Sequence, residues 1–158
     1  EFVGTNGVNG GKFKNSEDLA SKAISLWKGK LKPLIVLTGG EPLLQVNDSL
    51  IEELHKIGFE IALETNGTIK APDNIDWICV SPKENSRLKQ DHGDELKLVF
   101  PQQKIKPSDF EDLNFRNFLL QPMDGPEVKN NIIDARKFCI HNNNWKLSLQ
   151  AHKIFGYP

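Results

Sequence analysis

The feature that most constrains this chain is an apolar run that stops on glycines and a carboxylate. The run is Leu34-Ile-Val-Leu37, and Thr38-Gly-Gly-Glu-Pro42 follows it directly. Consecutive leucine and β-branched residues are typical of a strand covered on both faces, as in parallel sheets. In α/β barrels ligands bind at the carboxyl ends of such strands, so Glu41 could hold a cationic group such as an amine. Alternatively, the segment is only a tight turn that opens a helix with Pro42 at its first position.

Later segments repeat this arrangement of an apolar run with a polar or glycine-containing tip, at 61–68, 77–83, 118–125 and 146–153. We expect strands at 34–37, 59–63, 75–80, 95–100, 115–121 and 145–150, and helices at about 16–29, 47–57 and 126–142, the first with Ser16 as its N-cap. Strands that alternate with helices are typical of parallel α/β folds. We therefore predict one α/β domain over residues 1–158, a partial and incompletely closed barrel whose strands present their carboxyl ends to a shared ligand.

The composition excludes several classes of partner. The chain has 158 residues, of which 38% are hydrophobic and 26% charged, and its formal net charge is −1. It has no dense block of lysine and arginine, so we expect no nucleic-acid partner. No apolar run approaches the length of a membrane span, so we expect no membrane partner. Cys79 and Cys139 lack any Cys-x-x-Cys spacing, and we expect both to be buried and reduced, which suits the cytoplasm.

No metal site is predicted from the remaining acidic and imidazole side chains. The aspartates outside the motifs are scattered, and we expect them to be solvated: Asp73, Asp76, Asp91 and Asp94. Three histidines match no functional pattern: His55, His92 and His141.

Six motifs run in order from near the first residue to near the last. They are Gly4–Phe13, Thr38–Gln45, Glu64–Thr68, Val80–Lys83, Leu120–Gly125 and Trp145–Lys153. The second resembles the S-adenosylmethionine-binding motif of the radical S-adenosylmethionine superfamily. The ordered set, with Gln-Ala-His-Lys near the end, resembles the 7-carboxy-7-deazaguanine synthase family. Ala151 departs from that pattern, because members commonly carry threonine there.

The resemblance implies a carbon–nitrogen lyase. Its members convert 6-carboxy-5,6,7,8-tetrahydropterin into 7-carboxy-7-deazaguanine with loss of ammonia, a ring contraction on the route to queuosine and other deazapurines. The implied cofactors are S-adenosyl-L-methionine, a [4Fe–4S] cluster and Mg²⁺. The implied partners are the pterin substrate, an external electron donor such as flavodoxin or ferredoxin, and a second copy of the chain in a homodimer.

The resemblance also implies a role for individual residues. Thr38, Gly40 and Glu41 would hold the methionyl amine of the cofactor, with Gly39 leaving the backbone bare. Ser81 and Lys83 would meet its ribose or carboxylate, and Gln121 its ribose hydroxyls or adenine edge. Glu64, His152 and the terminal carboxylate of Pro158 would bind the pterin, since a carboxylate accepts two adjacent N–H groups. Alternatively, these are a solvated lysine (Lys83), a strand-end cap (Gln121), a turn cap (Glu64), a surface histidine (His152) and a frayed end (Pro158).

Family members hold the cluster on three cysteines of one loop that ends just ahead of Phe-Val-Gly. Since this chain begins at that point, we expect it to lack the first strand and the cluster loop and to be inactive by itself. Cys79 and Cys139 lie on separate expected elements and cannot replace those ligands. Two alternatives stay open: another radical S-adenosylmethionine enzyme, such as a glycyl-radical-activating enzyme, or a cluster-free chain without catalytic activity.

Overall fold

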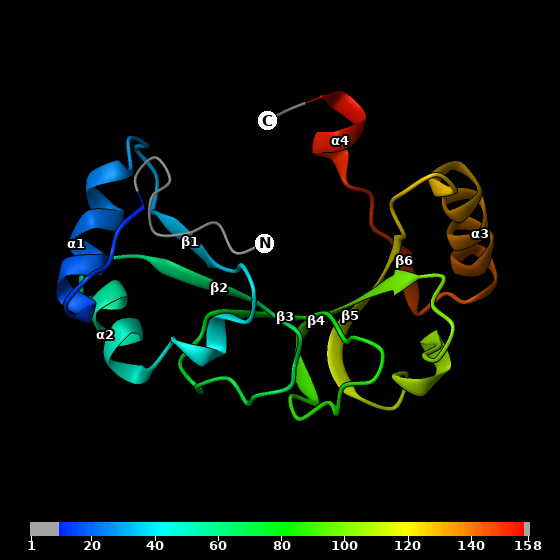
Figure 1. Ribbon diagram of the computed structural model, residues 1–158, viewed down its shortest axis with the longest axis horizontal. Helices are drawn as coiled ribbons and strands as arrows, with labels where there is room; N and C mark the ends of the chain where they lie inside the picture. The colour runs from blue at the N-terminus through cyan, green and yellow to red at the C-terminus, as the bar shows by residue number, and fades with distance from the viewer. Residues whose placement is uncertain (1–9, 157–158) are drawn as a thin grey trace. The chain divides into compact units, whose positions relative to one another are not determined.

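The computed structural model describes residues 10–156 (Figure 1). The strands are β1 (Leu34–Leu37), β2 (Glu60–Thr65), β3 (Trp77–Val80), β4 (His92–Phe100), β5 (Asn114–Pro122) and β6 (Trp145–Leu147). The α-helices are α1 (Ser16–Leu26), α2 (Asp48–Lys56), α3 (Val128–His141) and α4 (Ala151–Phe155), and two short 3₁₀ helices are η1 (Pro42–Leu44) and η2 (Pro107–Asp109).

The strands form one sheet in the order β1-β2-β3-β4-β5-β6. Pairing is parallel between β1 and β2, between β3 and β4, and along β4, β5 and β6. The expected parallel α/β fold is therefore confirmed, and β1 and β6 are the edges of a sheet that hydrogen bonds do not close within residues 10–156. Contacts divide the chain into two compact units, residues 1–65 with 70–78 and residues 66–69 with 79–158, so the single domain stays a prediction.

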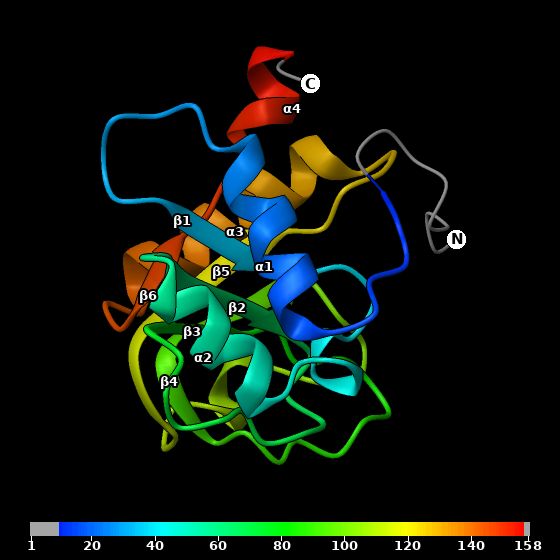
Figure 2. The same cartoon turned by 90° about the vertical axis from the view of Figure 1, so that its left-hand side faces the viewer.

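In the first unit, α1 and α2 lie side by side (Figures 1 and 2), and α2 packs on β2. Both helices begin at an asparagine cap: Asn15 Oδ1 accepts from the Asp18 N–H at 2.7 Å, and Asn47 Oδ1 accepts from the Leu50 N–H at 3.0 Å. The prediction of Ser16 as N-cap was therefore wrong by one residue. Fully buried side chains of α2 and β2 form the core of this unit: Ile51, Leu54, Ile61 and Leu63.

The expectation that β1 is covered on both faces was also wrong. Leu34 is 52% exposed and Val36 is 48% exposed, whereas Ile35 and Leu37 are half-buried. Successive side chains of a strand point to opposite faces. Since α1 and α2 lie on the same side of β1 and β2 (Figures 1 and 2), they cover only one face of the strand.

The second unit is built on the long ladder between β4 and β5, with α3 packed on β5 and β6. Leu96, Leu98 and Leu120 are buried in its core. An aromatic cluster joins α3 to the strands. The centroid of the Phe138 ring lies 5.9 Å from that of Phe100 and 6.4 Å from that of Trp145.

The last predicted strand, 145–150, ends at Leu147; residues 148–150 belong to no strand or helix, and α4 begins at Ala151. The Ser148 N–H still donates to the Leu120 carbonyl at 2.9 Å. The next parallel bond would need an N–H from Pro122, which proline lacks. The chain therefore leaves the sheet and turns into α4, where Ala151 N–H donates to Leu149 O at 2.9 Å.

Three of the four aspartates that we expected to be solvated make ion pairs; one is Asp91, whose Oδ1 lies 2.9 Å from Nδ1 of the neighbouring His92. Asp76 Oδ2 lies 2.8 Å from His55 Nε2 and accepts from the Ile61 N–H at 2.8 Å, which ties α2 to β2. In the second unit, Asp94 pairs with Arg116 at 2.9 Å. Among the described residues, no helix has the length and apolar character needed to cross a bilayer.

Asp76→Asn should lower the free energy of unfolding at pH 7, and this loss should shrink as the pH falls below about 4. Partial burial raises the pKa of Asp76, but hydrogen bonds from His55 and the Ile61 N–H outweigh it and hold the pKa below its ordinary 3.8. A carboxylate whose folded pKa is depressed stabilises above its unfolded pKa, and this contribution is lost as the pH falls through the folded pKa. Urea unfolding of both proteins between pH 7 and 3 tests this, with the exposed Asp73→Asn as control; a pH-independent loss would contradict it.

Candidate functional site

In the first unit, the loop after β1 presents exposed backbone beside the end of β2. Thr38, Gly39 and Gly40 are all exposed, and a Cβ added at Gly39 would meet no atom within 4 Å. Leu37 pairs with Leu63, so Thr38 and Glu64 follow at the same level of two parallel strands. The structure therefore brings the predicted cofactor residues of this loop close to the predicted pterin residue Glu64.

Glu41 is held by two hydrogen bonds that end on Oε1. The Leu43 N–H donates at 3.1 Å, which makes Glu41 the N-cap of η1, and Thr65 Oγ1 donates at 2.7 Å. Thr65 is only 3% exposed, so its hydroxyl is a fixed donor. The turn that opens a helix with Pro42 at its first position is thus confirmed, whereas the binding of a cationic group by Glu41 stays a prediction. The half-buried Glu41 carboxylate therefore caps η1 and joins the loop to β2, and these hydrogen bonds fix its position.

In the second unit, Ser81 and Lys83 converge after β3. Lys83 Nζ donates to Ser81 Oγ at 3.2 Å, and both follow the fully buried Val80. An exposed ammonium beside a hydroxyl is suited to a carboxylate or to ribose hydroxyls. The structure therefore confirms that these two side chains lie together, while their role stays a prediction.

Gly67 fixes the segment that carries these two residues. Its carbonyl accepts from Lys89 N–H at 2.7 Å and from Gln90 N–H at 3.0 Å. Its φ is +76°, and a Cβ there would lie 2.5 Å from Leu88 Cδ1 and 2.7 Å from Val80 Cγ1. Only glycine fits this conformation without strain. A side chain here would displace Val80, the residue directly before Ser81. The sequence gives no local signal for this packing, because Leu88 and Val80 are distant from Gly67 along the chain.

The remaining predicted residues lie toward the end of the second unit. Gln121 is half-buried and pairs with Val99 across the β4–β5 ladder. His152 is exposed on α4, next to Lys153, which forms an ion pair with Asp124. Asp124 and Lys153 carried no predicted role. Pro158 lies outside the described residues.

The described cysteines do not fit an iron–sulfur cluster. Cys79 is buried in β3 and Cys139 is half-buried in α3, and both are free, so the expectation that both are buried was wrong for Cys139. Burial raises the pKa of the Cys139 thiol, whereas a cluster ligand must be a thiolate. Within residues 10–156 no three His, Cys, Asp or Glu side chains gather to hold a metal ion.

No family model matches this sequence. It is 52% identical over 159 residues to the 7-carboxy-7-deazaguanine synthase of Caulobacter vibrioides, an alignment that covers 100% of this chain and 76% of the relative. The chain belongs to the 7-carboxy-7-deazaguanine synthase family. The synthase of Bradyrhizobium diazoefficiens is also 52% identical, over 157 residues that cover 99% of this chain and 75% of that protein.

A solved structure agrees with this family assignment. The crystal structure of QueE from Escherichia coli matches with a TM-score of 0.65 and 28% sequence identity, covering 85% of this chain and 63% of that one. The resemblance predicted from the motifs is therefore confirmed at the level of the family and the fold. The chain spans less than two thirds of that solved structure.

Gly67→Ala should lower the free energy of unfolding by about 2–5 kcal/mol, since the positive φ costs about 1–2 kcal/mol and the overpacking about 1–3 kcal/mol. Gly58→Ala is the matched control, because φ is +99° there but a Cβ would meet no atom within 4 Å. The control should therefore lose only the conformational part. Chemical denaturation of both variants measures the difference, and equal losses would show that the space around Gly67 does not matter.

Proposed function

We propose that this chain is the main part of a 7-carboxy-7-deazaguanine synthase, a carbon–nitrogen lyase that contracts the ring of 6-carboxy-5,6,7,8-tetrahydropterin with loss of ammonia. The observation that carries the proposal is 52% identity to a relative of that name across the whole chain. The site geometry supports it, because the motif residues lie at the carboxyl ends of parallel strands in both units.

S-adenosylmethionine would be held by groups matched to its charges. We propose that Glu41, fixed by Leu43 N–H and Thr65 Oγ1, accepts the cationic methionyl amine, together with Thr38 and the bare backbone of Gly39 and Gly40. Because Glu41 is already oriented, little side-chain entropy is lost on binding. Lys83, with Ser81, would meet the carboxylate or ribose of the cofactor, and Gln121 its ribose hydroxyls or adenine edge. When bound, the cofactor would supply the radical that takes hydrogen from the pterin.

The pterin would be oriented by Glu64, His152 and the terminal carboxylate of Pro158. Glu64 is exposed near the end of β2. Its two carboxylate oxygens would accept hydrogen bonds from two adjacent N–H groups on the aminopyrimidinone edge of the pterin. His152, exposed on α4, would meet a heteroatom or the carboxylate of the substrate.

The other cofactors and partners of this reaction rest on the family alone. The described residues do not fit a [4Fe–4S] cluster, so we derive no step through it. A Mg²⁺ ion on the substrate carboxylate, an electron donor such as flavodoxin or ferredoxin, a homodimer and a cytoplasmic location are proposals of the same kind.

The complete coding sequence, expressed and reconstituted anaerobically with iron and sulfide, should turn over 6-carboxy-5,6,7,8-tetrahydropterin with S-adenosylmethionine and Mg²⁺. Glu64→Ala should reduce kcat/KM by about 100-fold or more, because two charge-assisted hydrogen bonds are lost. Glu60→Ala is the control, since Glu60 is an exposed glutamate of the same strand. Cleavage of S-adenosylmethionine without any pterin turnover would rule out the proposed substrate.

Glu41→Gln should separate the structural role of this side chain from its charge. The amide oxygen still accepts from Leu43 N–H and Thr65 Oγ1, so the melting temperature should change little. Affinity for S-adenosylmethionine should fall about tenfold or more, because the charge-assisted bond to the amine is lost. Equilibrium dialysis measures the affinity and thermal denaturation the melting temperature. Glu41→Ala should lower both quantities, and the exposed Glu52→Gln should change neither. Unchanged affinity in Glu41→Gln would remove Glu41 from the site.

A further inference from the structure

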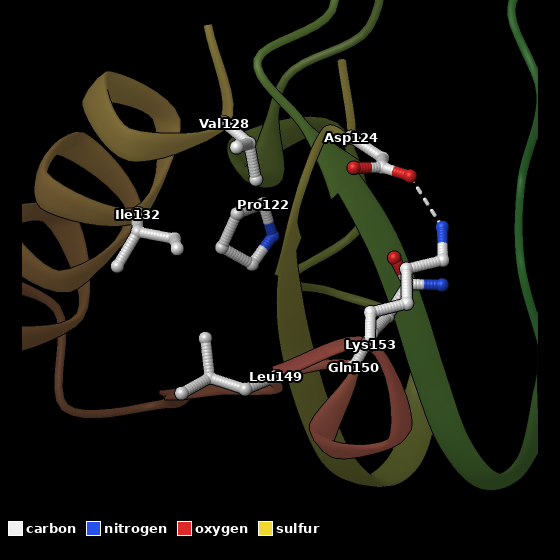
Figure 3. A pocket seen from close by; sticks show the side chains of 7 residues that line it. All are labelled: Pro122, Asp124, Val128, Ile132, Leu149, Gln150 and Lys153. Atoms are coloured by element: carbon white, nitrogen blue, oxygen red, sulfur yellow. Dashed lines mark hydrogen bonds and ion pairs between the residues drawn. The ribbon is translucent and has the colours of Figure 1, made fainter. Parts of the chain in front are cut away.

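The segment after β6 is attached to the second unit at two places. Leu149 faces Pro122 at the end of β5, and Val128 and Ile132 in the first turns of α3, across a small pocket (Figure 3). These side chains, with Asp124, Gln150 and Lys153, line this pocket, which has a volume of about 50 Å³. Leu149 is 44% exposed, so it anchors the segment only loosely.

The second attachment is an ion pair. Lys153, on α4, donates from Nζ to Oδ2 of Asp124, in the connection between β5 and α3 (Figure 3). The lysine side chain is 47% exposed and the aspartate 53% exposed. The hydrogen bond from Lys153, with the Gly125 N–H and the lysine charge, holds the pKa of Asp124 below its ordinary value. Asp124 is therefore a charged partner for Lys153 at neutral pH.

A helix as short as α4 needs such support. It spans only Ala151–Phe155 and has no side-chain cap at its N-terminus. Isolated helices of this length are not stable in water, because nucleation fixes several residues for few hydrogen bonds. Contacts with the rest of the unit must therefore hold α4, and the ion pair is a long-range one, between residues 29 positions apart.

His152 directly precedes Lys153 on α4. Consecutive residues of an α-helix are rotated by about 100° around its axis. If Lys153 is turned toward Asp124, the rotation of α4 is fixed, and His152 is directed to a different side. We propose that the Asp124–Lys153 ion pair is a latch that holds α4 in the orientation from which His152 binds the pterin. This inference rests on the proposed function of His152, and it makes Asp124 and Lys153 positioning residues.

Hydrogen exchange tests the latch without any turnover. In the protein expressed from its complete coding sequence, Asp124→Asn and Lys153→Gln should each speed amide exchange in residues 150–156 by about threefold to fivefold, within the range of an exposed ion pair. Exchange in β4 and β5 should not change. The swapped variant Asp124→Lys/Lys153→Asp should restore slow exchange, because it re-forms a pair of opposite charge.

Matched controls come from a second exposed pair of the same unit. Asp134 and Lys137 lie 3.9 Å apart on α3, and both are more than half exposed. Asp134→Asn and Lys137→Gln change the net charge as the latch variants do, and they should leave the exchange of residues 150–156 unaltered.

Substrate binding then tests the positioning role. Anaerobic calorimetric titration with 6-carboxy-5,6,7,8-tetrahydropterin, in the absence of S-adenosylmethionine, should show about fivefold weaker binding in each single latch variant and recovery in the swapped one. Binding of S-adenosylmethionine and the melting temperature should stay as in the wild type.

Each result has a distinct meaning. Unchanged exchange in the single variants, or no recovery in the swap, overturns the latch. Faster exchange with unchanged pterin affinity shows that α4 is held by the pair but does not position His152, which also overturns the proposal. A wild-type protein that does not bind the pterin at all overturns the proposed function and the role of the latch in substrate binding, while exchange still reports whether the pair holds α4.

Discussion

Parallel backbone pairing is the constraint on which the rest of this structure depends. Because β1 and β2 run in the same direction, the polar residues that follow them, Thr38 and Glu64, reach the same edge of the sheet. In the second unit, the β4–β5 ladder carries Gln121 to the corresponding end of its strand. If the strands were antiparallel, the carboxyl ends of neighbouring strands would lie at opposite edges of the sheet. The polar residues that follow these ends would then be far apart.

The residues at these ends serve the fold, and we propose that some of them also serve the site. Glu41 caps η1 and binds Thr65, and it is also the carboxylate that we assign to a cationic amine. Gly67 accepts two backbone N–H groups and leaves room for Val80, which precedes Ser81. Within each unit these residues are pre-organised, because the contacts that orient the side chains are already part of the folded state. Substitutions there must therefore be designed to separate stability from binding.

Sequence patterns predicted the order and type of nearly all elements, because apolar periodicity and turn residues are local signals. Where the prediction failed, the decisive partner was distant in sequence. β6 stops at Leu147 because Pro122, on β5, has no N–H to offer. Leu34 and Val36 are half-exposed because the helices cover only one face of β1. Asp76 is paired because folding brings His55 of α2 beside it.

The sequence by itself determined the α/β class, the motif positions and the family, since each of these is written in the order of residues along the chain. Only the tertiary structure decided which residues meet: Thr65 with Glu41, Gly67 with Leu88 and Val80, and Lys153 with Asp124. These pairs are separated in sequence by connections whose path depends on strand pairing and helix packing. Local propensity carries no information about such contacts, because their free energy is gained only when the strands and helices have come together.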